Sequence, residues 1–250
     1  MPNRLKLGNS MGSVGAGSEG FQVINSFLSD GTDEKFNLNT QADWSDYTNG
    51  SSKAFSIPFA IRKTRNGSVE AIVQQWGASN PVRSMALYFF NDKLYFQTKN
   101  EADANASANT TATFTNILDF YVGMLVYDSS QSLGSRVKIF MNGTDEALDA
   151  DTTDETLNTV TRTFEITPSS ALYINQVGLI NKACTFAEYT TWYNNGKPLN
   201  LRDTFGSDVK DWFNADNSGD TAQFTITDTV SDGWMSFNYE DADKVLINPY

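Results

Sequence analysis

The sequence contains no histidine among its 250 residues, and this absence excludes several kinds of site. A Ser-His-Asp triad and a Cys-His dyad both need an imidazole as general base, and many zinc sites need imidazole nitrogen as a ligand. The one cysteine, Cys184, means that no intrachain disulfide can form, which is typical of proteins folded in a reducing compartment. Histidine-based hydrolase mechanisms and disulfide scaffolds are therefore excluded.

Positive charge and long apolar runs are also scarce. Lys and Arg number 18 against 30 Asp and Glu, which gives a formal net charge of −12. An acidic surface repels phosphate backbones, so we expect no nucleic-acid partner. No apolar run approaches the roughly 18 residues of a membrane-spanning helix, and the first residues lack the apolar core of a signal peptide. We therefore expect synthesis in a cytoplasm and no membrane partner.

The chain divides into a short arm and one large domain. Residues 1–20 alternate glycine and serine with small residues, and such a segment cannot bury enough apolar surface to fold alone. Its charged and larger apolar anchors are Arg4, Leu5, Lys6 and Leu7. We expect this arm to dock either on its own domain or on a neighbouring chain. Residues 21–250, rich enough in hydrophobic residues for a sizeable core, are expected to form a single domain.

Beyond residue 20 the pattern is that of β-strands. Hydrophobic residues recur with period two between clusters of Asn, Asp, Gly and Ser. The expected strands span 54–63, 69–76, 85–98 as a hairpin, 120–127, 136–141, 159–166, 171–180, 222–228 and 244–247. Asn91-Asp92 and Asn142-Gly143 fit the positive φ angles of tight hairpin turns. So many short strands predict an all-β antiparallel sandwich.

Helix is expected in one place only. Thr185 and Glu188 have the spacing of a capping box, in which each side chain accepts a hydrogen bond from the other residue's amide. Gly196 and Pro198 favour a helix end soon afterwards. Two stretches rich in Ala, Asn, Asp and Thr, 100–113 and 144–156, are interpreted as long exposed loops.

Five short motifs follow one another in an informative order. They lie at 27–38, 55–57, 121–128, 137–143 and 187–198, the last reading Ala-Glu-Tyr-Thr-Thr-Trp-Tyr-Asn-Asn-Gly-Lys-Pro. Together, over roughly residues 21–201, they resemble the laminin-G-like, concanavalin A-like domains of tailed-bacteriophage virion proteins. The Trp and His that precede the family's long central strand are replaced here by residues 120–122, so no role of that histidine carries over.

The resemblance implies a jelly-roll sandwich and a non-enzymatic role. The protein would be a structural virion subunit, either a capsid decoration or a fibre-associated protein, made in the host cytoplasm and displayed on the particle's exterior in multiple copies. Residues 1–20 would dock on other capsid or tail proteins. The alternative is a glycan-binding adhesin module that holds host or environmental polysaccharide. A glycoside hydrolase or lyase is a remote third reading.

Carboxylates are candidates for two roles, as catalytic groups and as calcium ligands. Retaining glycosidases need two carboxylates on one face, and the nearest approach, Glu101 with Asp103, lacks the third member of the family pattern. Glu146 lies in the other stretch that is interpreted as a long exposed loop. Calcium would need loop oxygens, and it is a candidate cofactor only. Its candidate ligand sets are Asp30 with Asp33, Asp216 with Asp220, and Asp149 with Asp151 and Asp154.

Aromatic residues are the candidate sugar contacts. The flat apolar C–H face of a sugar stacks on Trp and Tyr, whose rings combine an apolar surface with a polar edge. Trp44 and Tyr47, in the polar segment Asp-Trp-Ser-Asp-Tyr, are therefore predicted as glycan-binding residues. Trp76 and Trp192 are predicted to lie in the core.

Overall fold

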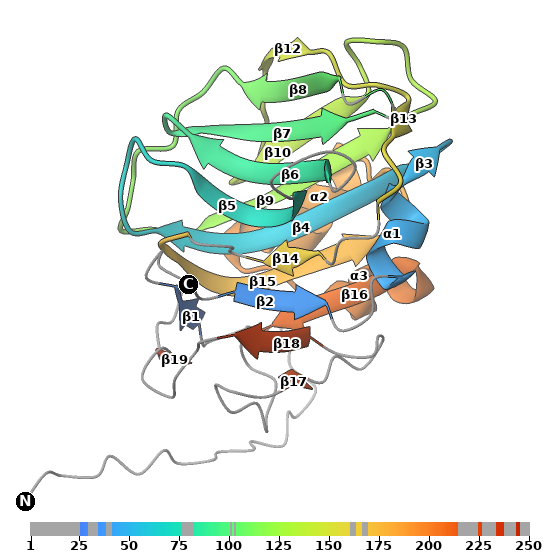
Figure 1. Ribbon diagram of the computed structural model, residues 1–250. Helices are drawn as coiled ribbons and strands as arrows, with labels where there is room; N and C mark the ends of the chain where they lie inside the picture. The colour runs from blue at the N-terminus through green and yellow to red at the C-terminus, as the bar shows by residue number, and fades with distance from the viewer. Residues whose placement is uncertain are drawn as a thin grey trace, which may run out of the picture.

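The structure, a computed structural model, is a sandwich of two antiparallel sheets with short helices (Figure 1). The residues that it describes are 26–29, 35–38, 42–76, 83–100, 102, 104–160, 164–166, 170–214, 225–226, 234–237 and 244–245. Within these ranges the all-β antiparallel fold predicted from the strand pattern is confirmed. No helix in the described part of the chain is long and apolar enough to cross a membrane.

The first sheet lies at the back in Figure 1, around the long strand β4. Its members in chain order are β1 (Ser26–Leu28), β4 (Ala54–Lys63), β9 (Tyr121–Asp128), β10 (Val137–Met141), β11 (Thr144–Asp145), β15 (Leu172–Ile180), β16 (Val209–Asn214) and β19 (Lys244–Val245). Their spatial order is β11-β10-β9-β4-β15-β1-β19. Strand β15 pairs with β1 in its first half and with β16 in its second half, opposite β4.

The second sheet lies in front, with the spatial order β12-β8-β7-β6-β5-β14-β2-β18-β17. Its members are β2 (Lys35–Leu38), β5 (Glu70–Trp76), β6 (Arg83–Phe90), β7 (Lys93–Lys99), β8 (Asn105–Thr110), β12 (Leu148–Asp151), β14 (Glu165–Ile166), β17 (Thr225–Ile226) and β18 (Trp234–Phe237). A small separate pair joins β3 (Gly50–Ser51) to β13 (Thr156–Leu157). Strands β5 to β8 form a meander of neighbours in the chain.

Aromatic side chains fill the space between the two sheets. Phe55 on β4 meets Phe96 on β7 edge-on, with ring centroids 6.4 Å apart. Tyr127 on β9 lies 6.0 Å from the same Phe96 ring. Phe89 on β6 packs 5.9 Å from Tyr121 on β9. Because the inward residues of each strand alternate with outward ones, this core uses the odd-numbered residues of β4 and β9, as the period-two pattern predicted.

Helices cover the other face of the first sheet, so β4 and β9 are buried on both sides. The helices on this face are α2 (Phe186–Tyr193) and α3 (Leu201–Phe205), followed by short 3-10 turns at Asn194–Gly196 and Gly206–Asp208. Helix α1 (Ala42–Thr48) lies elsewhere, and its Trp44 packs against Phe164, just before β14 of the second sheet. Tyr189 on α2 packs 5.2 Å from the ring of Phe140 on β10. Its hydroxyl donates to the carbonyl of Val122 at 2.9 Å. The outer face of the second sheet has no such helix over it in the described part of the chain.

Local signals in the sequence account for the turns and for the start of α2. Asn91 and Asp92 have φ angles of 48° and 62°, and Asn142 and Gly143 have 49° and 83°, so both predicted hairpin turns are confirmed. The amide of Glu188 donates to Thr185 Oγ1 at 3.2 Å, and the amide of Thr185 donates to Glu188 Oε2 at 2.8 Å. The predicted capping box is therefore confirmed.

Three expectations about local structure are wrong. The segment 100–113 contains strand β8, and 144–156 contains β11 and β12, where exposed loops were expected. The polar segment around Trp44 is helix α1, and α3 is a further helix where none was expected. The α2 helix also ends earlier than Gly196, since Asn194 takes the left-handed conformation at its C-terminus. These polar segments take their structure from neighbouring strands and from the core.

Candidate functional site

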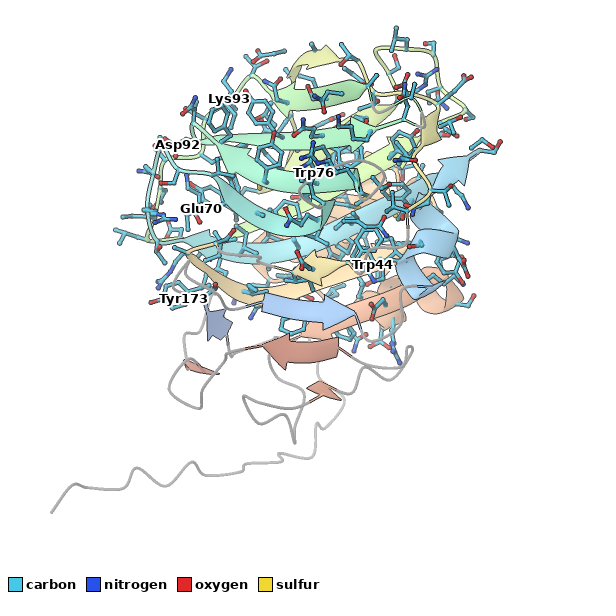
Figure 2. The ribbon with its side chains drawn as sticks, in the orientation of Figure 1. Trp44, Glu70, Trp76, Asp92, Lys93 and Tyr173 are labelled. Atoms are coloured by element: carbon cyan, nitrogen blue, oxygen red, sulfur yellow. The ribbon has the colours of Figure 1, made fainter. Side chains whose placement is uncertain are left out.

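The outer face of the second sheet carries a groove of about 340 Å³. Its lining comes from β5, β6 and β7 and from the residue just before β5: Val69, Ala71, Gln74, Trp76, Ala86, Tyr88, Phe90 and Gln97. Figure 2 shows Trp76 over the middle of this front sheet, and Asp92 and Lys93 at its left end. Aromatic rings, two alanines and two amides make up most of this surface, and no charged residue is among the lining side chains.

Strand alternation and register place these residues together. On β6, the buried residues Met85, Leu87 and Phe89 point into the sandwich, so Ala86, Tyr88 and Phe90 point outward. In the ladder, Tyr88 pairs with Ala71 on one side and with Tyr95 on the other. Ala86 pairs with Gln74 and Gln97. The small side chains of Ala71 and Ala86 therefore form a low floor between taller residues.

Aromatic rings form the walls of the groove. Tyr88 stacks on Tyr95 with ring centroids 5.6 Å apart and an interplanar angle of 16°. Phe90, 39% exposed, meets the same Tyr95 ring at 5.8 Å. At the other end of β6, the guanidinium of Arg83 lies 5.4 Å from the ring centre of Trp76. These contacts favour defined orientations of the rings.

Amide side chains supply the polar part of the site. Tyr88 donates its hydroxyl hydrogen to Gln97 Oε1 at 3.0 Å, and Gln97 Nε2 donates to Asn105 Oδ1 at 3.3 Å. Burial, with the neighbouring Tyr95, raises the pKa of Tyr88, so the phenol stays protonated and remains a donor. Gln74 Nε2 donates to Glu165 Oε2 at 3.2 Å. These hydrogen bonds orient each amide and leave it with further donor and acceptor capacity.

The nearest acidic and basic groups at the Phe90 end neutralise one another. Lys93 Nζ donates to Asp149 Oδ2 at 2.5 Å, and Asn109 Nδ2 donates to the same oxygen at 2.8 Å. The hydrogen bond from Lys93 is the main reason why the pKa of Asp149 lies below its usual value. This pair leaves that end of the groove with no net charge from these two side chains.

A larger polar cleft of about 630 Å³ lies at the β3–β13 pair and is lined by Lys53, Asp128, Glu155 and neighbouring serines. Asp128 already accepts from Ser130 Oγ at 2.6 Å and from Gln131 Nε2 at 2.9 Å. Lys53 Nζ donates to the carbonyl of Asp46 at 2.5 Å. The cleft has no aromatic platform, and both Asp128 and Lys53 already have hydrogen-bond partners within the protein. The groove on the second sheet is therefore the better candidate site.

The prediction that Trp44 contacts a glycan is wrong. Its side chain is 0% exposed, because helix α1 directs it into the core, where its ring packs 5.1 Å from Phe164. A fully buried ring has no face to offer a sugar. Tyr47 on the same helix is partly buried, and the ammonium of Lys210 lies 5.5 Å from its ring centre. A role for Tyr47 in glycan binding stays a prediction.

The predicted calcium ligand set that contains Asp151 is wrong. Asp151 Oδ2 accepts from the amides of Arg136 and Val137 at 2.7 and 3.0 Å, and Oδ1 accepts from the amide and hydroxyl of Thr153 at 3.0 and 2.5 Å. A carboxylate with four protein donors has no lone pair left for a metal. Within the described ranges no group of three metal-ligating side chains occurs. Asp30, Asp33, Asp216 and Asp220 lie outside the described residues, so their calcium role stays a prediction.

Of the candidate catalytic carboxylates, Glu146 is described by the structure, and it does not line the groove. Glu101 and Asp103 lie outside the described residues. Glu146 follows the edge strand β11 of the other sheet, and burial, with the adjacent Asp145, raises the pKa of its carboxyl. The arm 1–20, with Arg4, Leu5, Lys6 and Leu7, also lies outside the described residues, and so does its boundary with the domain. The groove lining itself contains no carboxylate.

The prediction that Trp192 lies in the core is confirmed, and the same prediction for Trp76 is wrong. Trp192 is 0% exposed in the core, as predicted. Trp76 is only partly buried and lines the groove. The signal that could have found the site was the alternation on β6, where Tyr88 and Phe90 occupy outward positions between core residues. An aromatic residue on the solvent face of a strand is informative because that face usually carries polar side chains.

Solved structures share this fold at low sequence identity, whereas no protein-family model and no curated protein sequence matches the chain. A Bacteroides ovatus protein proposed to bind carbohydrate is 13% identical, with a TM-score of 0.59, over 92% of this chain and 63% of that one. The receptor-binding domains of botulinum neurotoxin C/D mosaic serotype and botulinum neurotoxin D are each 14% identical, with TM-scores of 0.51 and 0.50. Each match covers 68% of this chain, and 42% and 43% of theirs.

The comparisons define a class of fold. The chain spans less than two thirds of each of these three structures. At such identities the likeness concerns the fold alone, which is a β-sandwich. The expected antiparallel β-sandwich is thereby confirmed, and the structures named here are described as binding proteins or binding domains. Bacteriophage origin and the particular features of laminin-G domains stay predictions of the sequence resemblance.

Proposed function

We propose that this domain binds carbohydrate, without catalysis, in the groove on the outer face of the second sheet. The observation that carries the proposal is the arrangement of Trp76 and Tyr88 at either side of an alanine floor with Gln74 and Gln97 beside it. Sugar rings have apolar C–H faces that stack on aromatic rings, and hydroxyls that exchange hydrogen bonds with amides. A largely apolar surface with a few oriented polar groups is typical of small-molecule sites.

The fold comparison supports a binding role. The Bacteroides ovatus protein of the same fold is itself proposed to bind carbohydrate, and the toxin domains are named for receptor binding. In sandwich glycosidases, two carboxylates must flank the scissile bond at a few ångströms. The groove offers neither a carboxylate nor, in this histidine-free chain, an imidazole. We therefore expect no turnover of laminarin, alginate, agar or peptidoglycan, and hydrolysis lost on substitution of Glu101 or Glu146 would contradict this.

The test is a glycan array followed by calorimetry on Trp76→Ala and Tyr88→Ala. Each variant should lose at least about tenfold in affinity, which corresponds to about 1.4 kcal/mol, because each removes a stacking surface. Tyr47→Ala is the matched control, an aromatic truncation on helix α1 away from the groove. Circular dichroism would establish that all three variants fold. If only Tyr47→Ala weakened binding, the glycan site would lie at α1 and the groove assignment would be wrong.

Display on a virion is a second candidate function, and the order of the sequence motifs between residues 27 and 198 favours it. A lectin-like sandwich on the outside of a particle would let many weak sugar contacts act together. The two candidates are compatible, since the first concerns what the groove binds and the second concerns where the domain is carried. Detection of the protein in purified particles by mass spectrometry, and labelling of intact particles with antibody, would test the exterior location.

A further inference from the structure

We infer that the ligand of the groove is a neutral, extended glycan that spans more than one sugar ring, and that acidic polysaccharides are excluded. This inference rests on the proposed carbohydrate-binding function and specifies its substrate class. Two separate observations lead to it. One is the chemistry of the groove lining, and the other is the distance between its aromatic walls.

The charge of the site favours a neutral ligand. No lining residue is charged, and the lysine nearest the Phe90 end, Lys93, is bonded to Asp149 at 2.5 Å. Arg83 packs its guanidinium against the indole of Trp76, 5.4 Å from the ring centre, and is not among the lining residues. A sugar carboxylate placed in the groove would lose hydration without gaining an ionic partner, which is strongly unfavourable. The chain's net charge of −12 adds a general repulsion of polyanions.

The register of the sheet favours a ligand longer than one ring. Trp76 pairs with Arg83 on β6, and Tyr88 lies five positions further along the same strand. The register shift between Gln75 and Trp76 takes up one of these positions, so at about 3.3 Å per ladder step the two aromatic rows are roughly 13 Å apart along the strand direction. A single pyranose ring cannot stack on both rows. An oligosaccharide that lies along β6 can stack one ring at each wall and cross the floor between them.

The alanine floor of the groove favours sugar rings whose substituents are equatorial. Ala71 and Ala86 carry only methyl groups, and both are almost fully buried, at 6% and 5% exposure. A ring with equatorial substituents can lie against such methyl groups, whereas axial hydroxyls would meet an apolar surface and lose their hydrogen bonds to water. Gln74 and Gln97, which pair with Ala86 from the two neighbouring strands, lie where equatorial hydroxyls at the ring edge would reach.

The experiment compares matched glycans by calorimetry on the full chain. The neutral probes are the hexasaccharides and disaccharides of β-1,4-glucan, β-1,4-xylan, β-1,3-glucan and β-1,4-mannan. The acidic probe is the hexasaccharide of β-1,4-glucuronan, which has the glucan backbone with a carboxylate at C6. We expect at least one neutral hexasaccharide to bind about tenfold or more tighter than its disaccharide, and the glucuronan to bind about tenfold or more weaker than the glucan. Binding should not change between about 0.05 and 0.5 M salt, because no charge attraction is involved.

Ala86→Leu supplies a steric variant, since a larger side chain on the floor should abolish hexasaccharide binding while both aromatic walls remain. Ala150→Leu, on the exposed edge strand β12, is its matched control and should bind as the wild type does. Tighter binding of glucuronan that falls with salt and depends on Arg83, yet is still lost in Trp76→Ala, would overturn the neutral-ligand inference and leave the groove as the site. Equal affinity for hexasaccharide and disaccharide would overturn the length inference. Failure of every probe to bind, or binding unaffected by Trp76→Ala and Tyr88→Ala, would overturn the proposed function as well.

Discussion

Trp44 donates its indole hydrogen to Asp211 Oδ2 at 2.5 Å, across 167 positions of the chain. Both side chains are 0% exposed. The bond joins helix α1 to the edge strand β16, which pairs with β15 in the first sheet. A buried charge-assisted hydrogen bond of this kind is needed wherever a carboxylate is removed from water. It explains why a tryptophan in a polar segment lies in the core.

Removal of this donor should destabilise the domain. Trp44→Phe keeps an aromatic ring but leaves the Asp211 oxygen without this partner, and an unsatisfied buried group costs about 1–3 kcal/mol. Asp211→Asn keeps an acceptor oxygen and should cost less than Asp211→Ala. Urea denaturation of the three variants measures these differences. Equal stability of Trp44→Phe and the wild type would show that the indole contributes by packing alone.

The capping box at the start of α2 should contribute measurably to stability. Thr185→Ala removes the acceptor of the Glu188 amide and should cost about 0.5–2 kcal/mol, while Thr185→Ser keeps the hydroxyl and should cost much less. Thermal unfolding of the two variants gives the comparison. Coincident midpoints for Thr185→Ala and wild type would mean that the cap adds nothing to the folded state.

The same box should make stability depend on pH in the acidic range. The hydrogen bond from Lys182, followed by that from the Thr185 amide, lowers the pKa of Glu188 below its ordinary value of 4.5. A carboxyl with a lowered pKa in the folded state stabilises fully above the unfolded value and loses that contribution as pH falls through the folded value. Glu188→Gln should therefore be less stable than wild type at neutral pH, with a difference that shrinks below pH 4.5. A difference that is constant with pH would show that the charge is not involved.

Gly123 on β9 should not tolerate even a methyl group. A Cβ at this position would lie 2.5 Å from Cζ of Phe59, whose ring crosses the glycine in the core. Gly123→Ala should cost about 1–3 kcal/mol through overpacking. The cost should be smaller in a Phe59→Leu background, because a smaller neighbour leaves room for the methyl group. A double-mutant cycle by urea denaturation measures this coupling, and purely additive effects would contradict the proposed contact.

Deletion of residues 1–20 should leave a soluble, folded domain that no longer joins a particle or oligomer. Ordering a Gly/Ser-rich segment costs on the order of 1 kcal/mol or more per residue, so an ordered arm needs contacts to offset that cost. Size-exclusion chromatography of the truncated and full chains, and incorporation into particles, are the measurements. Normal incorporation of the truncated protein would contradict a docking role for Arg4, Leu5, Lys6 and Leu7.

The sequence predicted the elements whose signals are local. The turn at Asn142-Gly143 needs positive φ angles, and the capping box needs two side chains three residues apart, so both were found. Strand β8, Asn-Ala-Ser-Ala-Asn-Thr, was missed because it has no large hydrophobic residue. It forms a strand through pairing with β7 and β12, and only neighbours distant in sequence provide those partners.

The part of the groove on β5 could not have been predicted, because the apolar run of that strand does not show which side chains face outward. Register shifts between Ala71 and Val73, and again between Gln75 and Trp76, decide the side on which each residue lies. Gln75 is consequently 0% exposed, while Trp76 is partly buried at the surface. A bulge reverses the alternation beyond it, and its position depends on tertiary pairing. Sequence reasoning therefore placed the indole of Trp76 in the core.

Strand β6 encodes two properties in alternate residues. Met85, Leu87 and Phe89 belong to the core, whereas Ala86, Tyr88 and Phe90 line the groove. Substitutions in the second set change the groove surface and leave these three core side chains in place, so their effects on the proposed binding and on folding should be close to independent. A combinatorial library restricted to positions 86, 88 and 90 would thus sample new recognition chemistry on a constant scaffold. The same separation gives natural variants a path along which specificity can evolve while stability is preserved.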